Sequence, residues 1–451
     1  MTGRALAYRL PPGVDSPDAP IESRDQLVAH LAAGESPDGP SLLGVELELL
    51  PMRADGRAAP FEGPGGVEQL LRSLAERGLE AVEAEGHVIG LRTDTVAVHL
   101  EPGAQVELAL APRARTRDVL DDVLSWRNVL RSAASDDLHL VALGLQPVTP
   151  IRDIGWIPRN RYRLMSEYLA THGTLGHHMM KATAGAQFTV DYRDETNAAE
   201  IVRTTLALSP IVNALCANSP LEEGRPNGFL TKRPHVWANT DPSRTGILPW
   251  IERDRFSYDR YVEWALAAPL MFVLREGHWL RIGDRSFAQF LDVGHPEAGR
   301  ARYEDFVLHL TTLFPEVRLK QHIEIRGADS CPSELVAAVA ALWRGLLYHP
   351  GGSSFAAELA HEWTIPERQR LHEDAGRLGM AARIRGRSVA EIAATLIDCA
   401  ARGLLALDGS TGPDLPLLEP LRKIAESGET LAEILLREWP RDGAAALLRH
   451  A

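Results

Sequence analysis

The chain has 451 residues, a formal net charge of −13, and ordinary apolar (45%) and charged (24%) fractions. A chain of this length can bury a large core as one domain or as two to three smaller ones. The negative charge argues against nucleic acid and anionic membranes as general partners. The sequence has no signal-peptide core and no run of about 18 apolar residues, so we expect a cytoplasmic protein that does not cross a membrane.

The chain divides into three regions by its local patterns. Residues 1–40 are rich in Pro, Asp and Gly and form a predicted N-terminal extension with one short amphipathic helix near 21–33. Residues 41–330 alternate short strand-like runs with helices and Pro/Gly turns. Residues 331–451 carry apolar residues at helical spacing. We therefore predict one domain over 41–451, in which a sheet-rich core is covered by a helical region.

The first strand-like run, LLGVELELL at 42–50, holds two glutamates among apolar residues. In a strand, Glu46 and Glu48 point to one face and their apolar neighbours to the other. Two adjacent like charges repel, and burying either alone is costly, so water, an arginine or a cation must compensate them. From this run alone, an edge strand with solvated glutamates is the more common explanation.

Two later segments repeat this arrangement. VAVHLEPGAQVELALAP at 96–112 predicts a strand, a Pro-Gly turn and a strand, with Glu101 before the turn and Gln105 and Glu107 on one face. VRLKQHIEIRGAD at 317–329 places Glu324 and Arg326 on one face of a predicted strand. Three such segments favour a sheet whose polar face is a binding site.

The chemistry of these side chains indicates what the site holds. Carboxylates suit Mg²⁺ or Mn²⁺, and carboxylate-rich magnesium sites commonly hold nucleotide phosphates. The sequence has neither a Gly-Lys dipeptide nor a GxGxxG motif, so bound ATP would need metals and arginines to hold its phosphates. Arg326 fits that role, although a structural salt bridge to Glu324 explains it equally well from the residues alone.

A polar segment at 217–246 is dense in Pro, Gly and Asn and carries Arg225, Lys232, Arg233 and Arg244 around Trp237. Irregular segments with fixed charges often line sites. Two arginines could hold the α-carboxylate of an amino acid. The alternative is an exposed basic loop that balances an acidic protein.

Several motifs occur in a fixed order between residues 41 and 350: GVELEL, LEPGAQVELALAP, PRNRYRLM, LGHHMMKATAGAQF, ANSPLEEGRPNGF, RPHVWANTDPSRTG, FPEVRLK and IEIRGAD. As a set they resemble the plant-type glutamate–cysteine ligase family, which also occurs in many bacteria. The resemblance implies an α+β, glutamine-synthetase-like catalytic fold, with a curved antiparallel β-sheet and helices packed on its outside.

The resemblance also implies the reaction. Members of the family use ATP as co-substrate, with Mg²⁺ or Mn²⁺, to convert the γ-carboxylate of L-glutamate to γ-glutamyl phosphate. The amine of L-cysteine then attacks, giving γ-glutamylcysteine, ADP and phosphate, the first step of glutathione biosynthesis. The expected partners are these small molecules, and we expect a monomer or homodimer that binds neither nucleic acid nor a membrane.

The resemblance further assigns roles to individual residues. The implied metal ligands are Glu46, Glu48, Glu101, Glu107 and Glu324. The implied catalytic residues are Glu324 and Arg326. The implied ATP contacts are Gln187, Lys320 and Arg326. The implied L-glutamate contacts are Arg233, Trp237 and Arg244. The implied substrate pocket includes Met180 and Thr189.

Some residues depart from the family pattern. Thr189 stands where relatives commonly have Asn, and the stretch GHHMMKAT is unusual in its histidines and in Lys181. A γ-glutamyl ligase that uses a different amine therefore stays open as an alternative. So do a non-catalytic regulatory homologue and, less directly, a Mg²⁺-dependent hydrolase of acidic substrates.

Overall fold

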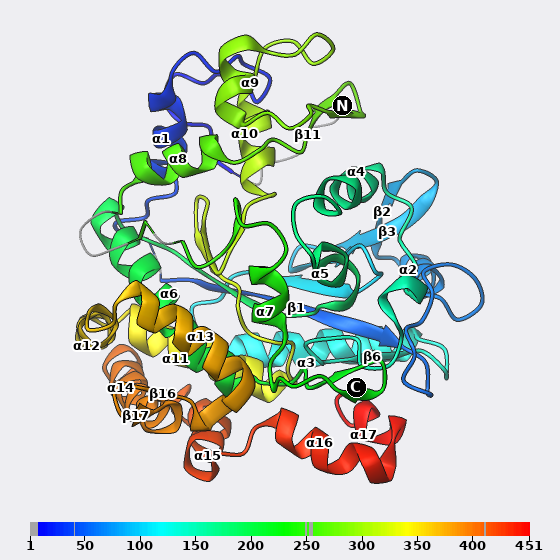
Figure 1. Cartoon of the computed structure of the whole chain (residues 1–451), viewed down its shortest axis with the longest axis vertical. Helices are drawn as coiled ribbons and strands as arrows, with labels where there is room; N and C mark the ends of the chain where they lie inside the picture. The colour runs from blue at the N-terminus through cyan, green and yellow to red at the C-terminus, as the bar shows by residue number, and fades with distance from the viewer. Residues whose placement is uncertain (1–7, 40, 249, 252–255, 410–411) are drawn as a thin grey trace.

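The computed structural model describes residues 8–39, 41–248, 250–251, 256–409 and 412–451 (Figure 1). In this part of the chain one nine-stranded sheet has the order β14–β15–β7–β1–β5–β4–β3–β2, with β6 paired to β1. Every pairing within it is antiparallel. Its strands are β1 (Leu43–Met52), β2 (Glu80–Ala84), β3 (His87–Arg92), β4 (Val96–Leu100), β5 (Val106–Leu110), β6 (His139–Val141), β7 (Ala186–Val190), β14 (Val317–Leu319) and β15 (Ile323–Ile325).

The two faces of β1 differ as its alternating sequence predicts. Val45, Leu47 and Leu49 are almost fully buried in the main hydrophobic core. Glu46 and Glu48 point to the opposite face, because side chains in a strand alternate. The apolar face is covered by α2 (Val67–Glu76), α3 (Thr116–Ala133), α6 (Glu195–Leu215) and α11 (Ser333–Leu347), of which α3 and α11 lie below β1 in Figure 1. The predicted α+β fold, with helices packed outside an antiparallel sheet, is confirmed.

Helices also stand over the polar face of the sheet (Figure 1). They are α4 (Asn160–Leu169), α5 (Gly176–Ala182) and α7 (Arg233–Ala238). Small strand pairs connect this layer: β8 (Leu221–Glu222) with β9 (Arg225–Pro226), β10 (Thr245–Gly246) with β13 (Phe314–Pro315), and β11 (Phe272–Arg275) with β12 (His278–Arg281). The layer closes a space over the glutamates of β1.

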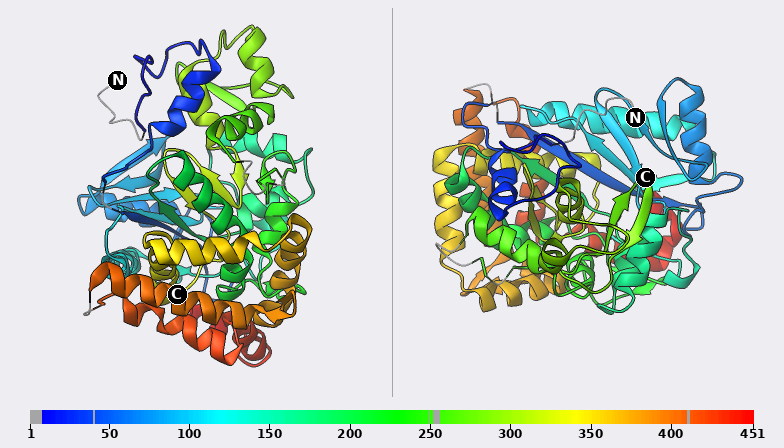
Figure 2. Two further views of the ribbon diagram at one scale, coloured as in Figure 1. Left: turned by 90° about the vertical axis from the view of Figure 1, so that its left-hand side faces the viewer. Right: turned by 90° about the horizontal axis from the view of Figure 1, so that it is seen from above.

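The last 120 residues are helical, as predicted, apart from the short pair β16 (Arg383–Ile384) and β17 (Arg387–Ser388). Nearly every residue of α11 is buried, which is typical of an inner helix. Of the outer helices, the first, third and fourth along the chain pack against α11, and all six form one end of the molecule (Figure 2). They are α12 (Pro350–His361), α13 (Ile365–Leu378), α14 (Val389–Asp408), α15 (Glu419–Ser427), α16 (Leu431–Asp442) and α17 (Ala444–Leu448).

The N-terminal residues pack beside α8 (Tyr258–Ala267), α9 (Phe287–Val293) and α10 (Tyr303–Leu310), at the top of Figure 1. The helix predicted near 21–33 is α1 (Arg24–Ala32). Leu27 and Leu31 on α1 belong to the same hydrophobic core as the sheet. The division of the chain at residue 40 stays a prediction.

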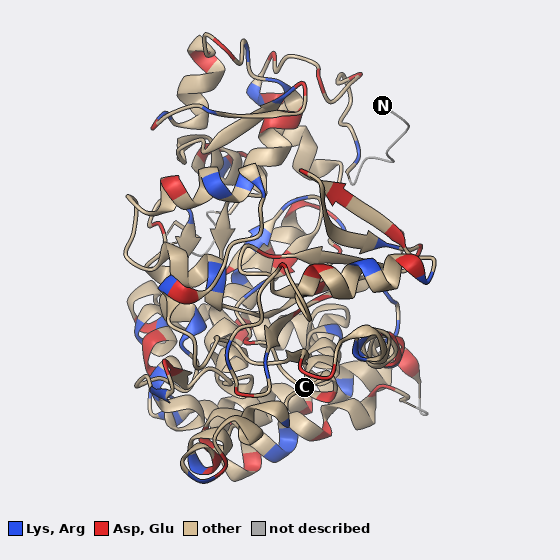
Figure 3. Cartoon of the chain, turned by 90° about the vertical axis from the view of Figure 1, so that its right-hand side faces the viewer, with Lys and Arg blue, Asp and Glu red and all other residues tan. Residues whose placement is uncertain are grey.

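Two further properties concern the surface and the membrane. Charged residues of both signs are spread over the outer helices in the view of Figure 3 instead of gathering on one element. Among the described residues, no helix is both long and apolar enough to cross a membrane.

Candidate active site

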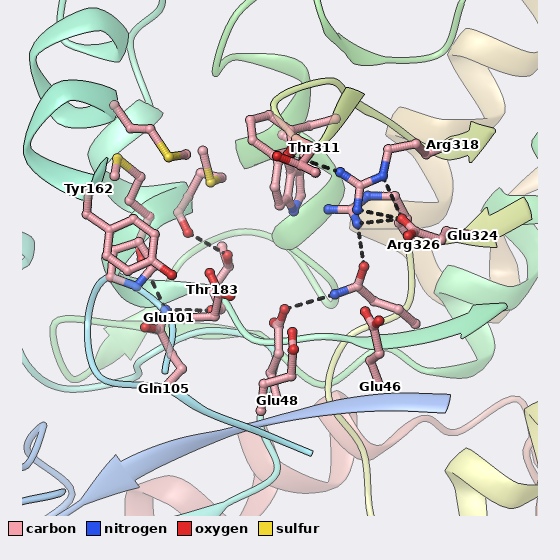
Figure 4. A pocket seen from close by; sticks show the side chains of 18 of the residues that line it. Glu46, Glu48, Glu101, Gln105, Tyr162, Thr183, Thr311, Arg318, Glu324 and Arg326 are labelled. Carbon is pink, nitrogen blue, oxygen red and sulfur yellow. Dashed lines mark hydrogen bonds and ion pairs between the residues drawn. The ribbon is translucent and has the colours of Figure 1, made fainter. Parts of the chain in front are cut away.

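A cavity of about 230 Å³ lies over the polar face of the sheet, and all five glutamates singled out from the sequence line it (Figure 4). Strand register explains why they meet. Glu48 on β1 lies opposite Glu107 on β5, and Glu46 lies opposite Gln187 on β7. Opposed residues of an antiparallel pair share one face. The same rule brings in Glu324, since it lies opposite Thr189 on β7.

Four carboxylates form what we call the acidic floor of the cavity: Glu46, Glu48, Glu101 and Glu107. The Glu48 carboxylate accepts hydrogen bonds from the Gly185 amide at 2.6 Å and from Gln187 Nε2 at 3.0 Å. Burial, with the charge of Glu48 nearby, raises the pKa of Glu101 to about 7. Burial and the neighbouring carboxylates, Glu46 first, raise the pKa of Glu107 well above its usual range. Ionising all four carboxyl groups together would therefore place more negative charge here than the protein neutralises.

Three cations form the opposite, basic end of the cavity: Arg318, Lys320 and Arg326. Arg318 Nε donates to Glu324 at 2.6 Å, and Lys320 Nζ forms an ion pair with the same carboxylate. Burial alone would raise the pKa of Glu324, but Arg318 and Lys320 hold it well below its usual range. Glu324 is thus an ionised anchor for the basic end.

Arg326 connects the two ends of the cavity. Its guanidinium lies 3.4 Å from Glu324 and donates to the Gln187 side-chain oxygen, whose amide nitrogen reaches Glu48 (Figure 4). The ring of Trp237 lies 5.4 Å from its guanidinium carbon. Burial, together with the charge of Arg318, lowers its pKa to about 10, so it stays charged at neutral pH. A rigid, buried cation of this kind is suited to an anionic ligand.

The remaining walls are largely apolar. Met165, Met179 and Met180 line one side, and Trp237 and Phe314 line another. The first side is fixed by Gln105, whose amide nitrogen donates to the Thr183 carbonyl at 2.9 Å. Apolar walls around fixed charges are typical of sites that bind small molecules.

Sequence reasoning missed two cations of this cavity. Arg318 belongs to the quoted motif FPEVRLK, and its spacing of two from Lys320 was the available signal. Arg161 on α4 lines the cavity, donates to the Thr311 hydroxyl at 3.0 Å, and has a buried Nε without a hydrogen-bond partner among the described residues. No local pattern could place Arg161 here, because α4 reaches the cavity only through the tertiary fold.

Three residues assigned from the sequence do not line the cavity. Arg244 is fully buried elsewhere, where Asp241 accepts from its Nε at 2.7 Å and the Pro269 carbonyl from its Nη2 at 2.6 Å. Arg233 lies behind Trp237 and donates to the Arg326 carbonyl at 2.5 Å. Thr189 lies further along β7. Of the implied glutamate contacts, only Trp237 reaches the cavity directly.

The acidic floor fits a hard divalent cation by its chemistry, since it offers only carboxylate oxygens and an uncompensated negative charge. No three His, Cys, Asp or Glu side chains in the described ranges form a preassembled metal centre. A cation at this place would therefore need the carboxylates to adjust around it, or ligand oxygens to complete its shell.

The antiparallel sheet with helices on its outside is the predicted glutamine-synthetase-like fold, and solved structures of ligases match it. A glutamate–cysteine ligase from Francisella tularensis in complex with AMP matches with a TM-score of 0.58 at 11% identity, over 91% of this chain and 87% of that one. A bifunctional glutathione synthetase from Pasteurella multocida matches with a TM-score of 0.53 at 14% identity, over 90% of this chain and 51% of that one.

The sequence comparison is more specific. The model of the glutamate-cysteine ligase family 2 matches residues 42–449, and the chain belongs to this family. The chloroplastic glutamate–cysteine ligase of Arabidopsis thaliana is 34% identical over 433 residues, which is 92% of this chain and 80% of that protein. The chloroplastic ligase B of Oryza sativa subsp. japonica is 32% identical over 428 residues, or 93% and 85% of the two chains.

These relatives also correct one expectation. They are chloroplastic proteins, which contradicts the cytoplasmic location expected from the sequence. That expectation was wrong because it rested on composition and on the lack of a secretory signal. Neither property distinguishes the cytoplasm from the interior of a plastid.

Proposed function

We propose that this protein joins the γ-carboxylate of L-glutamate to the amine of L-cysteine at the expense of ATP, giving γ-glutamylcysteine, ADP and phosphate. The observation that carries the proposal is the juxtaposition of the acidic floor with the basic end in one buried cavity of a family member. A carboxylate is a poor acyl donor, and phosphorylation supplies a leaving group. Transfer of a phosphoryl group needs positioning and charge neutralisation more than covalent help.

The basic end supplies the neutralisation from protein groups. Arg326 is held by Glu324 and Gln187 and packed on Trp237, so it meets a phosphoryl group without reorganising. Lys320, on the same side, provides a second charge for the nucleotide's phosphates. Gln187 fixes the distance between Arg326 and the floor.

The acidic floor is the proposed place for Mg²⁺ or Mn²⁺. Glu46, Glu48, Glu101 and Glu107 would hold the ion, which would neutralise phosphate charge and bring phosphate oxygens to these carboxylates. Both oxygens of Glu324 contact basic side chains. We therefore propose that the main role of Glu324 is to position the basic end, beside the proposed ion.

The glutamate substrate is proposed to lie against Trp237 and Arg161. Arg161 lines the cavity and has a buried Nε without a hydrogen-bond partner among the described residues, and a guanidinium with a free donor suits an amino-acid carboxylate. Arg233 acts from behind Trp237 by fixing the backbone of Arg326. Arg244 is not retained as a contact, because its donors are already bound within the protein.

The identity of the amine rests on the methionine side of the cavity. Met165, Met179 and Met180 offer a soft, apolar surface that suits a small thiol side chain and keeps water from a reactive acyl phosphate. The unusual residues His177, His178, Lys181 and Thr189 do not line the cavity. The departures from the family pattern therefore give no reason for a different amine.

The test is ADP release from the purified protein with ATP, Mg²⁺ and L-glutamate, with L-cysteine compared against a panel of other amines. Stimulation by cysteine alone is the expected result. Stimulation by another amine would keep the phosphorylation step and replace the second substrate. ATP turnover that does not depend on glutamate would indicate a hydrolase, and tight binding without turnover would indicate a regulatory homologue.

A further inference from the structure

The N-terminal segment (residues 8–36) contacts the turn of the β14–β15 hairpin (320–322), which carries part of the basic end. The backbone N–H of Arg9 donates to Gln321 Oε1 at 2.7 Å, and Gln321 Nε2 donates back to the Arg9 carbonyl at 2.7 Å. The same Nε2 lies 3.0 Å from the carbonyl of His30 on α1. The amide of Gln321 thus satisfies both backbone groups of Arg9, as a neighbouring strand would.

A second set of contacts brings the two backbones together. The Tyr192 hydroxyl lies between the carbonyls of Leu31 and Lys320, within hydrogen-bond distance of both. A Cβ added to Gly34 would lie only 2.6 Å from the Cα of Gln321, so only glycine fits at this crossing. The contact is therefore close-packed as well as hydrogen-bonded.

The N-terminal segment is itself firmly attached. The amide of Ile21 donates to the Ala301 carbonyl at 3.1 Å, and the amide of Tyr303 donates to the Ala19 carbonyl at 2.9 Å. His30 Nδ1 forms a buried hydrogen bond with the Tyr303 hydroxyl. The segment is thus fixed on α10 and can serve as a support for the turn.

The other side of the turn faces the cavity. Lys320 forms an ion pair with Glu324, and His322 Nε2 lies 3.1 Å from the same carboxylate. Gln321, between them, points the opposite way and reaches Arg9. Fixing Gln321 from outside therefore fixes the directions of the two side chains that flank it.

We propose that Gln321 is a positioning residue and that the N-terminal segment completes the phosphate-binding end of the cavity by holding this turn. The segment never reaches the cavity, and it acts through Lys320, His322 and the anchor Glu324. The kinetic part of this inference rests on the proposed function, because it concerns the affinity for ATP. The structural part does not.

The kinetic test is the variant Gln321→Ala. We expect the KM for ATP to rise about threefold to tenfold, in line with the loss of one or two hydrogen bonds that order Lys320. The KM for L-glutamate should change less than about twofold, since its proposed contacts lie elsewhere, and the melting temperature should stay near that of the wild type. In Gln321→Glu a carboxylate oxygen can still accept a hydrogen bond from the Arg9 amide. The KM for ATP of this variant should therefore lie between those of the wild type and Gln321→Ala.

The matched control is Gln26→Ala. Gln26 accepts a hydrogen bond from the Glu22 amide at 2.9 Å within the same segment and does not contact the turn. This variant should keep the wild-type KM for ATP. A KM for ATP that is unchanged in Gln321→Ala, or raised equally in both variants, would overturn the proposal.

Hydrogen exchange of backbone amides at 319–323 gives a readout that needs no activity. The Lys320 amide donates to the His322 carbonyl at 2.9 Å, and its exchange should speed up in Gln321→Ala but not in Gln26→Ala. Unchanged exchange would overturn the structural part. If the wild type releases no ADP with glutamate, the proposed function fails, and this measurement still decides whether Gln321 holds the turn.

Discussion

The acidic floor and the basic end of the cavity are built in different ways. The floor lies in the middle of the sheet, where Glu48 and Glu107 face each other across paired strands that are fixed on both edges. The basic end lies on a two-strand hairpin at the edge of the sheet, where β14 has one strand partner. Strand register places Glu46, Glu48 and Glu107, and the turn between β4 and β5 places Glu101. The edge, in contrast, needs support from a segment far away in the sequence.

The largest expected effect comes from removing the centre of the basic end. Arg326→Ala should lower the rate of glutamate- and cysteine-dependent ADP release by about 10³-fold or more, because a buried cation at a transferring phosphoryl group contributes that much. Arg326→Lys keeps the charge without the planar contacts and should lose less. A loss below tenfold in Arg326→Ala would remove Arg326 from the transfer step.

The second largest effect should be a loss of stability on removing Arg244, which belongs neither to the acidic floor nor to the basic end. Arg244→Ala leaves the buried Asp241 carboxylate without its only ion-pair partner among the described residues and should lower the free energy of unfolding by about 3–5 kcal/mol. Urea unfolding measures this. Under conditions in which this variant is folded, its KM for L-glutamate should equal that of the wild type. A raised KM at unchanged stability would restore Arg244 as a glutamate contact.

The floor can be weakened by Glu107→Gln, which keeps its size and removes a charge. If the floor holds a divalent cation, ADP release should fall by about 10²-fold and should require more Mg²⁺ for half-maximal rate. Chelation of divalent ions should abolish the wild-type rate. The exposed Glu83→Gln, on β2 of the same sheet, is the control. An unchanged Mg²⁺ dependence in Glu107→Gln would exclude this carboxylate as a ligand.

Acid should loosen the support of the basic end through His30. Burial lowers the pKa of His30 to about 4, below its ordinary value of 6.5. The unfolded chain therefore takes up this proton first as the pH falls, and stability is lost between pH 6.5 and 4. From pH 7.5 to 5 the loss should be about 2 kcal/mol. His30→Asn should remove this part of the pH dependence in urea unfolding, and an identical pH slope would contradict it.

The smallest effect should come from separating the N-terminal segment from the hairpin by one methyl group. Gly34→Ala places a Cβ against the backbone of Gln321 and should cost about 1–2 kcal/mol of stability. Gly155→Ala, where an added Cβ meets nothing within 4 Å, should be close to neutral. Equal stability of both variants would show that the segment can move away from the turn without cost.

The comparison also explains what the sequence could predict. The period of two in strands is enough to place Glu46 and Glu48 on one face of β1, and the register of β1 with β5 adds Glu107 to that face. The arrangement of the basic end could be predicted only in part from the sequence. Glu324 and Arg326 share a face by the same rule, but the turn before them divides the segment into two short strands.

The positions of several arginine side chains could not be predicted from the sequence around them. Arg244 and Arg233 lie in one polar segment, and only packing decides that the first is paired in the interior and the second supports Trp237. Arg161 lies in the motif PRNRYRLM, but nothing in that motif shows that this arginine, and not Arg159 or Arg163, reaches the cavity. The pairing of Arg9 with Gln321 joins residues 312 positions apart, which no spacing rule can predict.

That separation has a consequence for the order in which the protein can be completed in the cell. During synthesis Arg9 leaves the ribosome 312 residues before its partner, an interval of roughly 15–60 s at ribosomal speeds. Until then Arg9 has no partner on the turn, and the phosphate-binding turn does not exist. Catalytic competence is therefore reached late in translation, when the two ends of a long stretch of nascent chain meet.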